Sequence, residues 1–281
     1  MKNAGIIGAG TMGSTIALSV ALSGFSAVVY DVSEVVLVES RKRIARIIKK
    51  GLEKNKIESS AANAVEENLF FTNDLEKLFA ADIVIEAIPE SLELKKTVIG
   101  QVVSHLSEEA IVASNTSSLS ITELASASGT PERFIGMHFF NPANIMPLVE
   151  LVFTDETSLE TKRAASQFVT SLGKTAVESK DSPGFIVNRV ARPFYGEALK
   201  ILGENSAEVG TIDQLMRSVG FPMGPFELID LVGCDVSLEV SKSIYNAHFQ
   251  DPRYRPHPIQ ERMVKAGRLG RKSGRGFYDY N

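Results

Sequence analysis

The sequence predicts an α/β fold in which a doubly wound, mostly parallel sheet is followed by a smaller all-helical domain. Two observations lead to this prediction. In the first part of the chain, short apolar runs alternate with helical patterns, which is typical of a parallel sheet flanked by helices. After Ser182, strand-like runs are almost absent, and Pro and Gly residues separate helical segments. We therefore expect an α/β domain over residues 1–181 and a helical domain over residues 182–281.

The expected strands are short, and several are apolar throughout, as in strands that are covered on both faces. They are Ala4–Gly8, Ala27–Asp31, Leu69–Thr72, Ile83–Ile88, Ala110–Ser114, Phe134–Phe139, Leu148–Phe153 and Lys174–Glu178. A polar insertion over about residues 33–68 separates the second strand from the third, and its pattern predicts two helices. In the second domain we expect helices over Gly184–Leu202, Ser206–Val219, Pro225–His248 and Ile259–Ala266.

The composition argues against several classes of protein. Of the 281 residues, 44% are hydrophobic and 23% are charged, which is ordinary for a globular enzyme. The formal net charge of −4 argues against a general nucleic-acid binder, whose affinity would come from Lys and Arg. Neither a signal peptide nor an apolar run of about 20 residues is evident, so we expect a cytoplasmic protein without a membrane partner. The single cysteine, Cys234, cannot form an internal disulfide or a multi-cysteine site, and we expect no bound metal.

A glycine-rich segment follows the first expected strand. Gly8, Gly10 and Gly13 fit the pattern G-x-G-x-x-G, and a helical pattern over Ser14–Ser23 comes directly after it. Gly8 would allow a tight turn, Gly10 a close approach of backbone to a pyrophosphate, and Gly13 close packing of helix on strand. The N-terminus of the helix would supply free N–H groups and a partial positive charge for the phosphates. We predict a dinucleotide site in a Rossmann-type fold.

Asp31 ends the second expected strand, 21 residues after Gly10. Its carboxylate can accept hydrogen bonds from the adenosine ribose and would repel the 2′-phosphate of NADP, so the predicted cofactor is NAD. The alternative is that the glycine turn and the carboxylate have purely structural roles.

Three polar segments follow expected strands at the edge where ligands bind in doubly wound sheets. These segments are Glu86 to Glu90, Ser114–Ser118 and His138–Pro142. Because parallel strands end at the same edge, we expect these side chains to converge beside the cofactor, as in an active site.

His138 is the candidate acid/base, since histidine titrates near neutrality and oxidation of an alcohol requires removal of its hydroxyl proton. Glu150 lies 12 residues later in an otherwise apolar strand, where an unpaired carboxylate would be costly. If the chain doubles back between them, the two side chains would pair and the carboxylate would stabilise the imidazolium. From these two residues alone, a satisfied core histidine and an exposed edge glutamate is an equally good interpretation.

Five segments spread over nearly the whole chain resemble the 3-hydroxyacyl-CoA dehydrogenase family, and in particular bacterial members of similar length that act on 3-hydroxybutyryl-CoA. The segments are Gly8–Gly13, Ala113–Ser118, His138–Glu150, Asp181–Arg189 and Gly270–Tyr278. The resemblance implies that His138 is the general base and that Glu150 pairs with it. It also implies that Ser117 and Asn188 contact the substrate.

The same resemblance implies that Glu90, Lys95 and Asn115 lie along the cofactor. Without it, Asn188 would be interpreted as a helix-surface residue and Ser117 as a loop hydroxyl.

The helical insertion carries a dense run of basic residues. A solvated helix face is the ordinary interpretation of such a run. The resemblance implies that this hairpin faces the CoA moiety, whose phosphates it would attract. The candidate CoA contacts are Lys49, Lys50, Lys54 and Lys56.

The segment Pro225–His248 is apolar on more than one face and therefore needs burial on several sides. Packing within its own domain is one interpretation. A homodimer interface through the C-terminal helices is the other, and we favour it because the family resemblance supports it.

We therefore predict reversible, NAD-dependent oxidation of an (S)-3-hydroxyacyl-CoA to the 3-oxoacyl-CoA, with a short acyl chain such as 3-hydroxybutyryl-CoA. One rival is a related dehydrogenase that acts on a free hydroxy acid or a sugar acid. A rival of another class is a protein that binds NAD without turnover.

Overall fold

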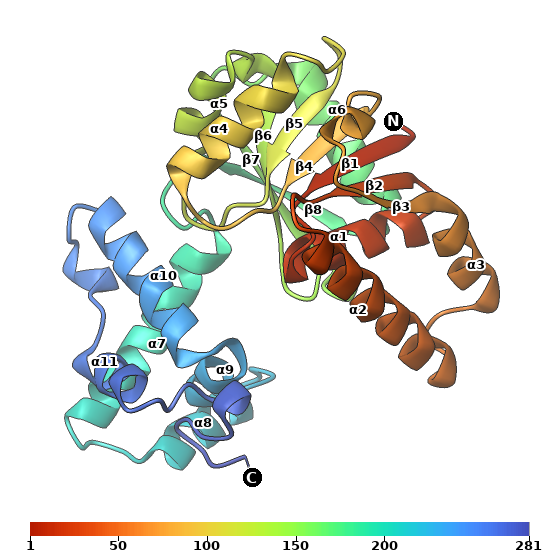
Figure 1. The fold of residues 1–281 in the computed structure, drawn as a ribbon. Coiled ribbons are helices and arrows are strands. Elements are labelled where there is room, and N and C mark those ends of the chain that lie inside the picture. The colour runs from red at the N-terminus through yellow and green to blue at the C-terminus, as the bar shows by residue number, and fades with distance from the viewer. Residues whose placement is uncertain (281) are drawn as a thin grey trace. The chain divides into compact units, whose positions relative to one another are not determined.

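The computed structural model describes residues 1–280 and divides the chain into two compact units (Figure 1). Unit 1 comprises Met1–Ser182, and unit 2 begins at Pro183.

Unit 1 is built on one eight-stranded sheet with the order β3-β2-β1-β4-β5-β6-β7-β8. The strands are β1 Asn3–Ile7, β2 Ser26–Tyr30, β3 Leu69–Thr72, β4 Ile83–Glu86, β5 Ile111–Ser114, β6 Phe134–Phe139, β7 Leu148–Phe153 and β8 Thr175–Lys180. All neighbouring strands are parallel except β6 and β7, which are antiparallel. The strand order reverses between β1 and β4, which is where doubly wound sheets bind their ligands.

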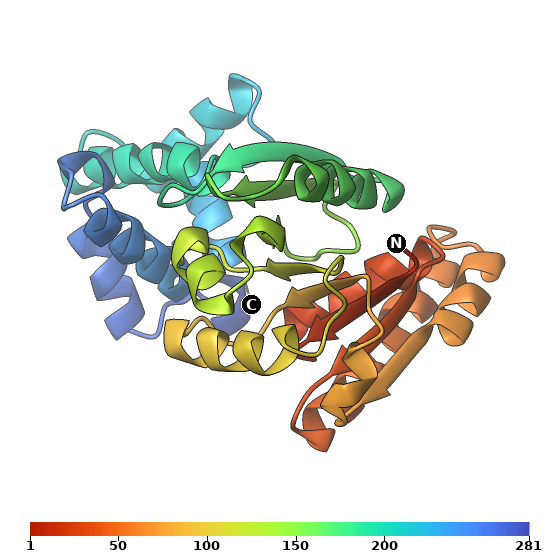
Figure 2. The same cartoon turned by 90° about the horizontal axis from the view of Figure 1, so that it is seen from above.

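Helices cover both faces of this sheet (Figures 1 and 2). They are α1 Thr11–Leu22, α2 Glu34–Glu53, α3 Ser59–Asn68, α4 Leu92–Val103, α5 Ile121–Ser128 and α6 Leu159–Ser171. The helices α4 and α5 pack together on one face, and α2 and α3 pack against α1 on the other. An edge-to-face contact between Phe25, just after α1, and Phe168 of α6 places α6 on the face of α1.

The apolar character of the strands explains this architecture. β4, β5 and β6 are buried over their whole lengths, as expected for parallel strands covered on both sides. The sequence prediction of a Rossmann-type, mostly parallel sheet followed by a helical part is therefore confirmed. The helices α4 and α5 also fit the alternation of strands and helices, although we predicted no bounds for them.

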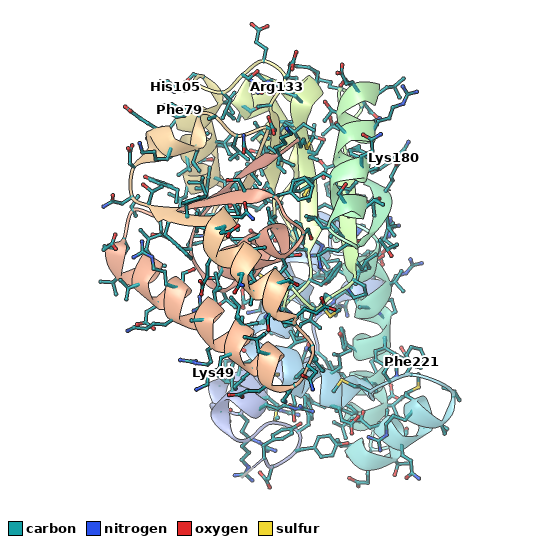
Figure 3. All side chains as sticks on the ribbon, turned by 90° about the vertical axis from the view of Figure 1, so that its right-hand side faces the viewer. Lys49, Phe79, His105, Arg133, Lys180 and Phe221 are labelled. Carbon is teal, nitrogen blue, oxygen red and sulfur yellow. The ribbon has the colours of Figure 1, made fainter. Side chains whose placement is uncertain are left out.

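The helical insertion forms α2 and α3, as predicted. Only three residues of α2 are buried, and they face α1 and the sheet. Lys49 lies on the exposed side of this helix (Figure 3), and Lys50, Lys54 and Lys56 are also exposed.

Unit 2 contains five helices within the described residues. They are α7 Val187–Gly203, α8 Val209–Ser218, α9 Pro225–Val232, α10 Cys234–Ala247 and α11 Pro258–Lys265. The single helix that we predicted over Pro225–His248 is wrong, because the chain breaks at Gly233 with φ of +104°. Glycine tolerates this backbone conformation, whereas other residues are strained in it.

The C-terminal segment of unit 2 packs against Asp230 of α9. The Asp230 carboxylate accepts hydrogen bonds from the backbone N–H groups of Phe277 and Tyr278, at 3.0 and 2.9 Å. A Cβ at Gly270 would lie 2.3 Å from the Asp230 carbonyl oxygen, and one at Gly276 would lie 2.1 Å from its carboxylate. These contacts give a structural reason for the glycines in the Gly270–Tyr278 segment.

Among residues 1–280, none of the helices combines the length and the apolar character needed to cross a bilayer.

Candidate functional site

The glycine loop between β1 and α1 has a distinct requirement at each of its three glycines. Gly8 has φ of +99°, and a Cβ at Gly13 would lie 1.8 Å from the Gly8 carbonyl oxygen. A Cβ at Gly10 would meet nothing within 4 Å. Gly8 and Gly13 are thus explained by the packing of the protein itself, whereas the space above Gly10 is open to a ligand that approaches the backbone.

Asp31 anchors this loop from the end of β2. Its Oδ2 accepts a hydrogen bond from the Ala9 N–H at 2.9 Å, and its Oδ1 accepts one from the Ser33 N–H at 3.0 Å. A carboxylate has about four lone-pair sites, so both oxygens retain capacity for the hydroxyl groups of a ribose.

A buried ion pair lies at the carboxyl end of β4. Lys95 Nζ is 2.6 Å from Glu86 Oε1, and the side chains are 1% and 0% exposed. Glu86 also accepts hydrogen bonds from the Ser114 hydroxyl at 2.6 Å and from the Ile88 N–H at 2.7 Å. The last bond turns the chain away from the sheet, which is why β4 ends at Glu86 and not at Ile88.

Glu90 organises the loop that follows β5. Its Oε1 accepts hydrogen bonds from the hydroxyl of Thr116, from the N–H of Ser117 at 3.0 Å and from the hydroxyl of Ser118 at 3.0 Å. Its Oε2 lies 3.3 Å from Lys95 Nζ. Burial alone would raise the pKa of Glu90, but the Lys95 ammonium and these hydrogen bonds outweigh it and hold the pKa below its ordinary value.

Asn115 ties the same loop to both neighbouring strands. Its backbone N–H donates to the Glu86 carbonyl, and its Oδ1 accepts from the Phe139 N–H, each at 2.8 Å. Phe139 directly follows His138, so Asn115 connects the end of β4 to the end of β6.

His138 and Glu150 face each other across the antiparallel pair β6 and β7. The register puts the two residues opposite one another, and Nδ1 of His138 lies 2.7 Å from Oε2 of Glu150. Their side chains are 8% and 0% exposed. The ring of Phe140 packs on the imidazole with centroids 4.5 Å apart, so the ring is held from two sides.

The turn that joins β6 to β7 is held by Lys174. Its Nζ donates to the carbonyl oxygens of Ala143 at 2.6 Å and Met146 at 2.9 Å. Burial lowers the pKa of this lysine. Lys174 is absent from the residues that we predicted for the site, and its sequence position before an edge strand gives no signal of this contact.

The predicted site residues fall into two sets. Those of the glycine loop, the Glu90 network, the His138 pair and the lysines of the insertion all belong to unit 1. Asn188 lies in the first turn of α7 in unit 2.

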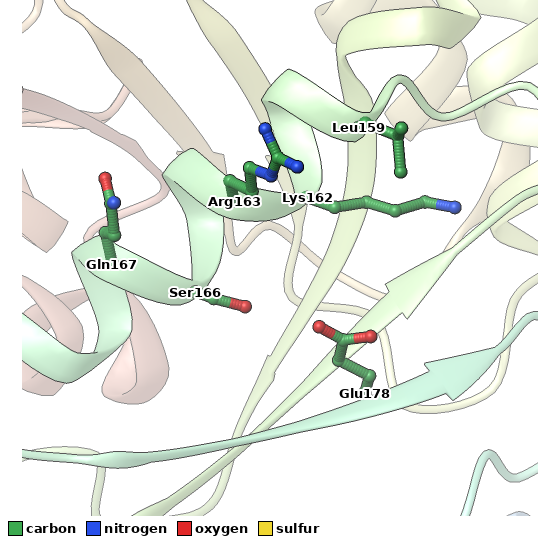
Figure 4. Close-up of a pocket in the computed structure, with 6 residues that line it drawn as sticks. All are labelled: Leu159, Lys162, Arg163, Ser166, Gln167 and Glu178. Carbon is green, nitrogen blue, oxygen red and sulfur yellow. The ribbon is translucent and has the colours of Figure 1, made fainter.

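A groove of about 380 Å³ between α6 and β8 contains none of these residues (Figure 4). It is lined by Leu159, Lys162, Arg163, Ser166, Gln167 and Glu178. Within the part of the chain that the structure describes, no cluster of three or more His, Cys, Asp or Glu side chains could hold a metal ion.

The doubly wound sheet carries a glycine loop with open space above Gly10, the Asp31 carboxylate at the position that binds ribose, and a histidine–carboxylate pair. Together these features are typical of a dinucleotide-dependent oxidoreductase. Comparison with known proteins narrows this class. Residues 3–182 match the NAD binding domain of 3-hydroxyacyl-CoA dehydrogenase, and residues 184–280 match its C-terminal domain. The chain therefore belongs to the 3-hydroxyacyl-CoA dehydrogenase family, is an enzyme of that family and uses NAD.

Individual relatives agree with this assignment. A probable 3-hydroxybutyryl-CoA dehydrogenase of Deinococcus radiodurans is 42% identical over 98% of this chain and 99% of its own. The crystal structure of (S)-3-hydroxybutyryl-CoA dehydrogenase from Ralstonia eutropha is 40% identical, with a TM-score of 0.95 over 100% of this chain and 99% of its own. The 3-hydroxyadipyl-CoA dehydrogenase of Escherichia coli is 40% identical over 100% of this chain, which spans only 59% of that longer relative.

Proposed function

We propose that this protein reversibly oxidises a short-chain (S)-3-hydroxyacyl-CoA to the 3-oxoacyl-CoA, with His138 as general base. The observation that carries the proposal is the 2.7 Å contact between His138 Nδ1 and Glu150 Oε2 inside the sheet. A buried carboxylate on Nδ1 fixes the tautomer in which this nitrogen carries a proton, and it leaves Nε2 as the basic nitrogen.

The residues around the glycine loop fit NAD, since Gly10 leaves open space and Asp31 retains acceptor capacity. When NAD is bound, it supplies the two-electron acceptor for the alcohol carbon. His138 takes the hydroxyl proton of the substrate at Nε2, and the resulting imidazolium is stabilised by the Glu150 carboxylate. In the reverse reaction, His138 returns this proton to the carbonyl oxygen. A base of this kind contributes roughly 10²- to 10⁴-fold to the rate.

Other residues would orient the reactants. Ser117 presents a hydroxyl from a loop that Glu90 holds through the Ser117 backbone N–H, so its side chain is available to an oxygen of the substrate. The family resemblance supports Asn188 as a second substrate contact. Glu90, Lys95 and Asn115 would form the wall along which the cofactor lies.

Two facts support a CoA thioester with a short acyl chain as the substrate. Lys49, Lys50, Lys54 and Lys56 are exposed on the helical insertion, where they can attract phosphates. Relatives of matching length from Deinococcus radiodurans and Ralstonia eutropha are named for 3-hydroxybutyryl-CoA. We therefore infer a CoA thioester with a four-carbon acyl group.

The decisive experiment follows NADH absorbance while the purified protein is offered acetoacetyl-CoA. We expect rapid oxidation of NADH by the wild type and a loss of roughly 10²- to 10⁴-fold in kcat for His138→Ala. His105→Ala is the matched control, because His105 is exposed and stacks on Phe79 at the surface (Figure 3). Equal activity of the wild type and His138→Ala would remove His138 from the chemistry.

The same assay separates the rival functions. Efficient turnover of free acetoacetate would favour a dehydrogenase of hydroxy acids. Binding of NADH without turnover of any 3-oxo compound would favour a non-catalytic protein.

We also propose a homodimer formed through unit 2. Exposed apolar side chains gather on its helices, including Leu231, Val232 and Val236, which are 45–49% exposed. Burial of this surface against a second copy would remove it from water. Sedimentation should show a dimer for the wild type and a smaller species for Leu231→Asp, and a monomeric wild type would contradict the proposal.

A further inference from the structure

Arg43 of α2 reaches the first turn of α1, next to the glycine loop. Its Nη1 donates to the Ser14 hydroxyl oxygen at 2.9 Å. This hydroxyl also lies 2.6 Å from the Gly10 carbonyl oxygen and 2.8 Å from the hydroxyl of Ser40. Ser14 and Ser40 are fully buried, so the guanidinium is attached to a fixed point behind the loop.

The position is electrostatically unusual for a cation. The N-terminus of a helix carries a partial positive charge, and a cationic side chain there is unfavourable unless an anion balances it. The first turn of α1 has no acidic residue. Among residues 1–280, Arg43 forms no direct salt bridge. The Glu39 carboxylate, one turn before it on α2, pairs with Lys42 at 2.9 Å and attracts Arg43 only at longer range.

A bound anionic ligand would balance the remainder of this charge. Asp31, the carboxylate on the other side of the loop, already accepts the N–H groups of Ala9 and Ser33. The space above Gly10 is open, and the Ser14 hydroxyl that bonds to Gly10 also holds Arg43.

We propose that Arg43 is an affinity residue for the pyrophosphate of NAD. Held on Ser14, its guanidinium adds a full positive charge to the partial charge of the α1 N-terminus and so stabilises the bound phosphates. The inference concerns the cofactor and not the acyl substrate, and it separates Arg43 from Lys49, Lys50, Lys54 and Lys56, which we assign to CoA.

A charge beside the glycine loop should affect only ligands that place a phosphate at that loop, which NADH and ADP-ribose would do, whereas the phosphates of coenzyme A would lie at the lysines of the insertion. For Arg43→Gln, we expect the Kd of NADH and of ADP-ribose to rise roughly 5- to 50-fold, with the larger change at low salt. Binding of adenosine and of coenzyme A should be unchanged, and Arg43→Lys should recover part of the affinity because it keeps the charge.

The experiment measures these dissociation constants by NADH fluorescence and by competition, in the absence of acyl-CoA substrate. The sequence contains no Trp, so no indole emission of the protein interferes with the fluorescence of NADH. Arg46→Gln is the matched control, because it removes the same charge from the exposed side of the same helix.

Selective loss of ADP-ribose affinity in Arg43→Gln, with Arg46→Gln unchanged, would support the proposal. Equal weakening of ADP-ribose and adenosine would show that Arg43 only packs α2 on α1, and this would overturn it. Unchanged ADP-ribose binding, or a loss of coenzyme A binding instead, would overturn it as well. Because no turnover is measured, failure here is distinct from failure of the proposed dehydrogenase reaction.

Discussion

Unit 1 contains two buried pairs of a basic and an acidic side chain, and the two pairs are built differently. Lys95 and Glu86 are nine residues apart, join β4 to the following helix, and share their contacts with Ser114, Ile88 and Glu90. His138 and Glu150 are paired by the register of two antiparallel strands, with the carboxylate on one ring nitrogen.

The difference shows what each arrangement suits. A lysine ammonium is a compact charge that carboxylates and carbonyl oxygens hold in place, so the Lys95 pair fixes the loops beside it. A histidine side chain gains and loses a proton in the neutral range, so its pairing with a carboxylate suits proton transfer. The first pair should therefore be needed mainly for stability and the second mainly for rate.

Replacement of Lys95 should give the largest effect. Lys95→Met leaves Glu86 buried without its cation, and we expect a loss of about 3–5 kcal/mol in the free energy of unfolding. Chemical denaturation followed by circular dichroism measures this loss. The double variant Glu86→Gln, Lys95→Met should recover much of the stability, and a single variant as stable as the wild type would contradict a structural role.

Replacement of Glu150 tests the other half of the comparison. Glu150→Gln keeps the size of the side chain but removes the charge that stabilises the imidazolium. A hydrogen bond between charged groups is worth about 1.5–3 kcal/mol, so we expect kcat to fall roughly 10- to 100-fold. Steady-state kinetics with acetoacetyl-CoA measures the change. Glu178→Gln, an exposed glutamate on the neighbouring strand β8, is the control and should retain full activity.

Glu90 should give the smallest effect, and one that depends on pH. Its pKa in the folded protein lies below the ordinary value of 4.5, so its charge stabilises the fold above that value. This contribution is lost as the pH falls through the lower pKa of the folded state. Glu90→Gln should thus be less stable than the wild type at pH 7 by about 1 kcal/mol or less, because the carboxylate is partly exposed.

Unfolding midpoints measured from pH 7 down to about pH 3 should converge for the wild type and Glu90→Gln. A constant gap between the two proteins would mean that the charge of Glu90 is not the source of its contribution.

The fold was predictable because most of its strands are largely apolar and alternate with helical patterns. The predicted bounds of β3, β6 and β7 equal those in the structure. The break at Gly233 was not predictable from the pattern, since apolar residues continue on both sides of it. One glycine within a helical pattern does not reveal whether the backbone adopts a positive φ there.

The candidate site was predictable where a single residue type stood out. A carboxylate in an apolar strand pointed to Glu150, and the short distance along the sequence pointed to His138 as its partner. Lys95 with Glu86, Lys174 with Ala143 and Met146, and Arg43 with Ser14 depend instead on how separate elements pack. Lysine and arginine are ordinary on helix surfaces and in turns, so the sequence pattern gives no sign of these three contacts. The family resemblance named Lys95, but not its pairing with Glu86.

The hydrogen bonds between Asp230 and the C-terminal segment have a consequence for biosynthesis. The sheet of unit 1 is complete once Lys180 has left the ribosome, and domains that emerge first generally fold first. The Asp230 carboxylate, in contrast, is 1% exposed and waits for the N–H groups of Phe277 and Tyr278. The contacts of Asp230 with Phe277 and Tyr278 can therefore form only after these last donors have emerged from the ribosome.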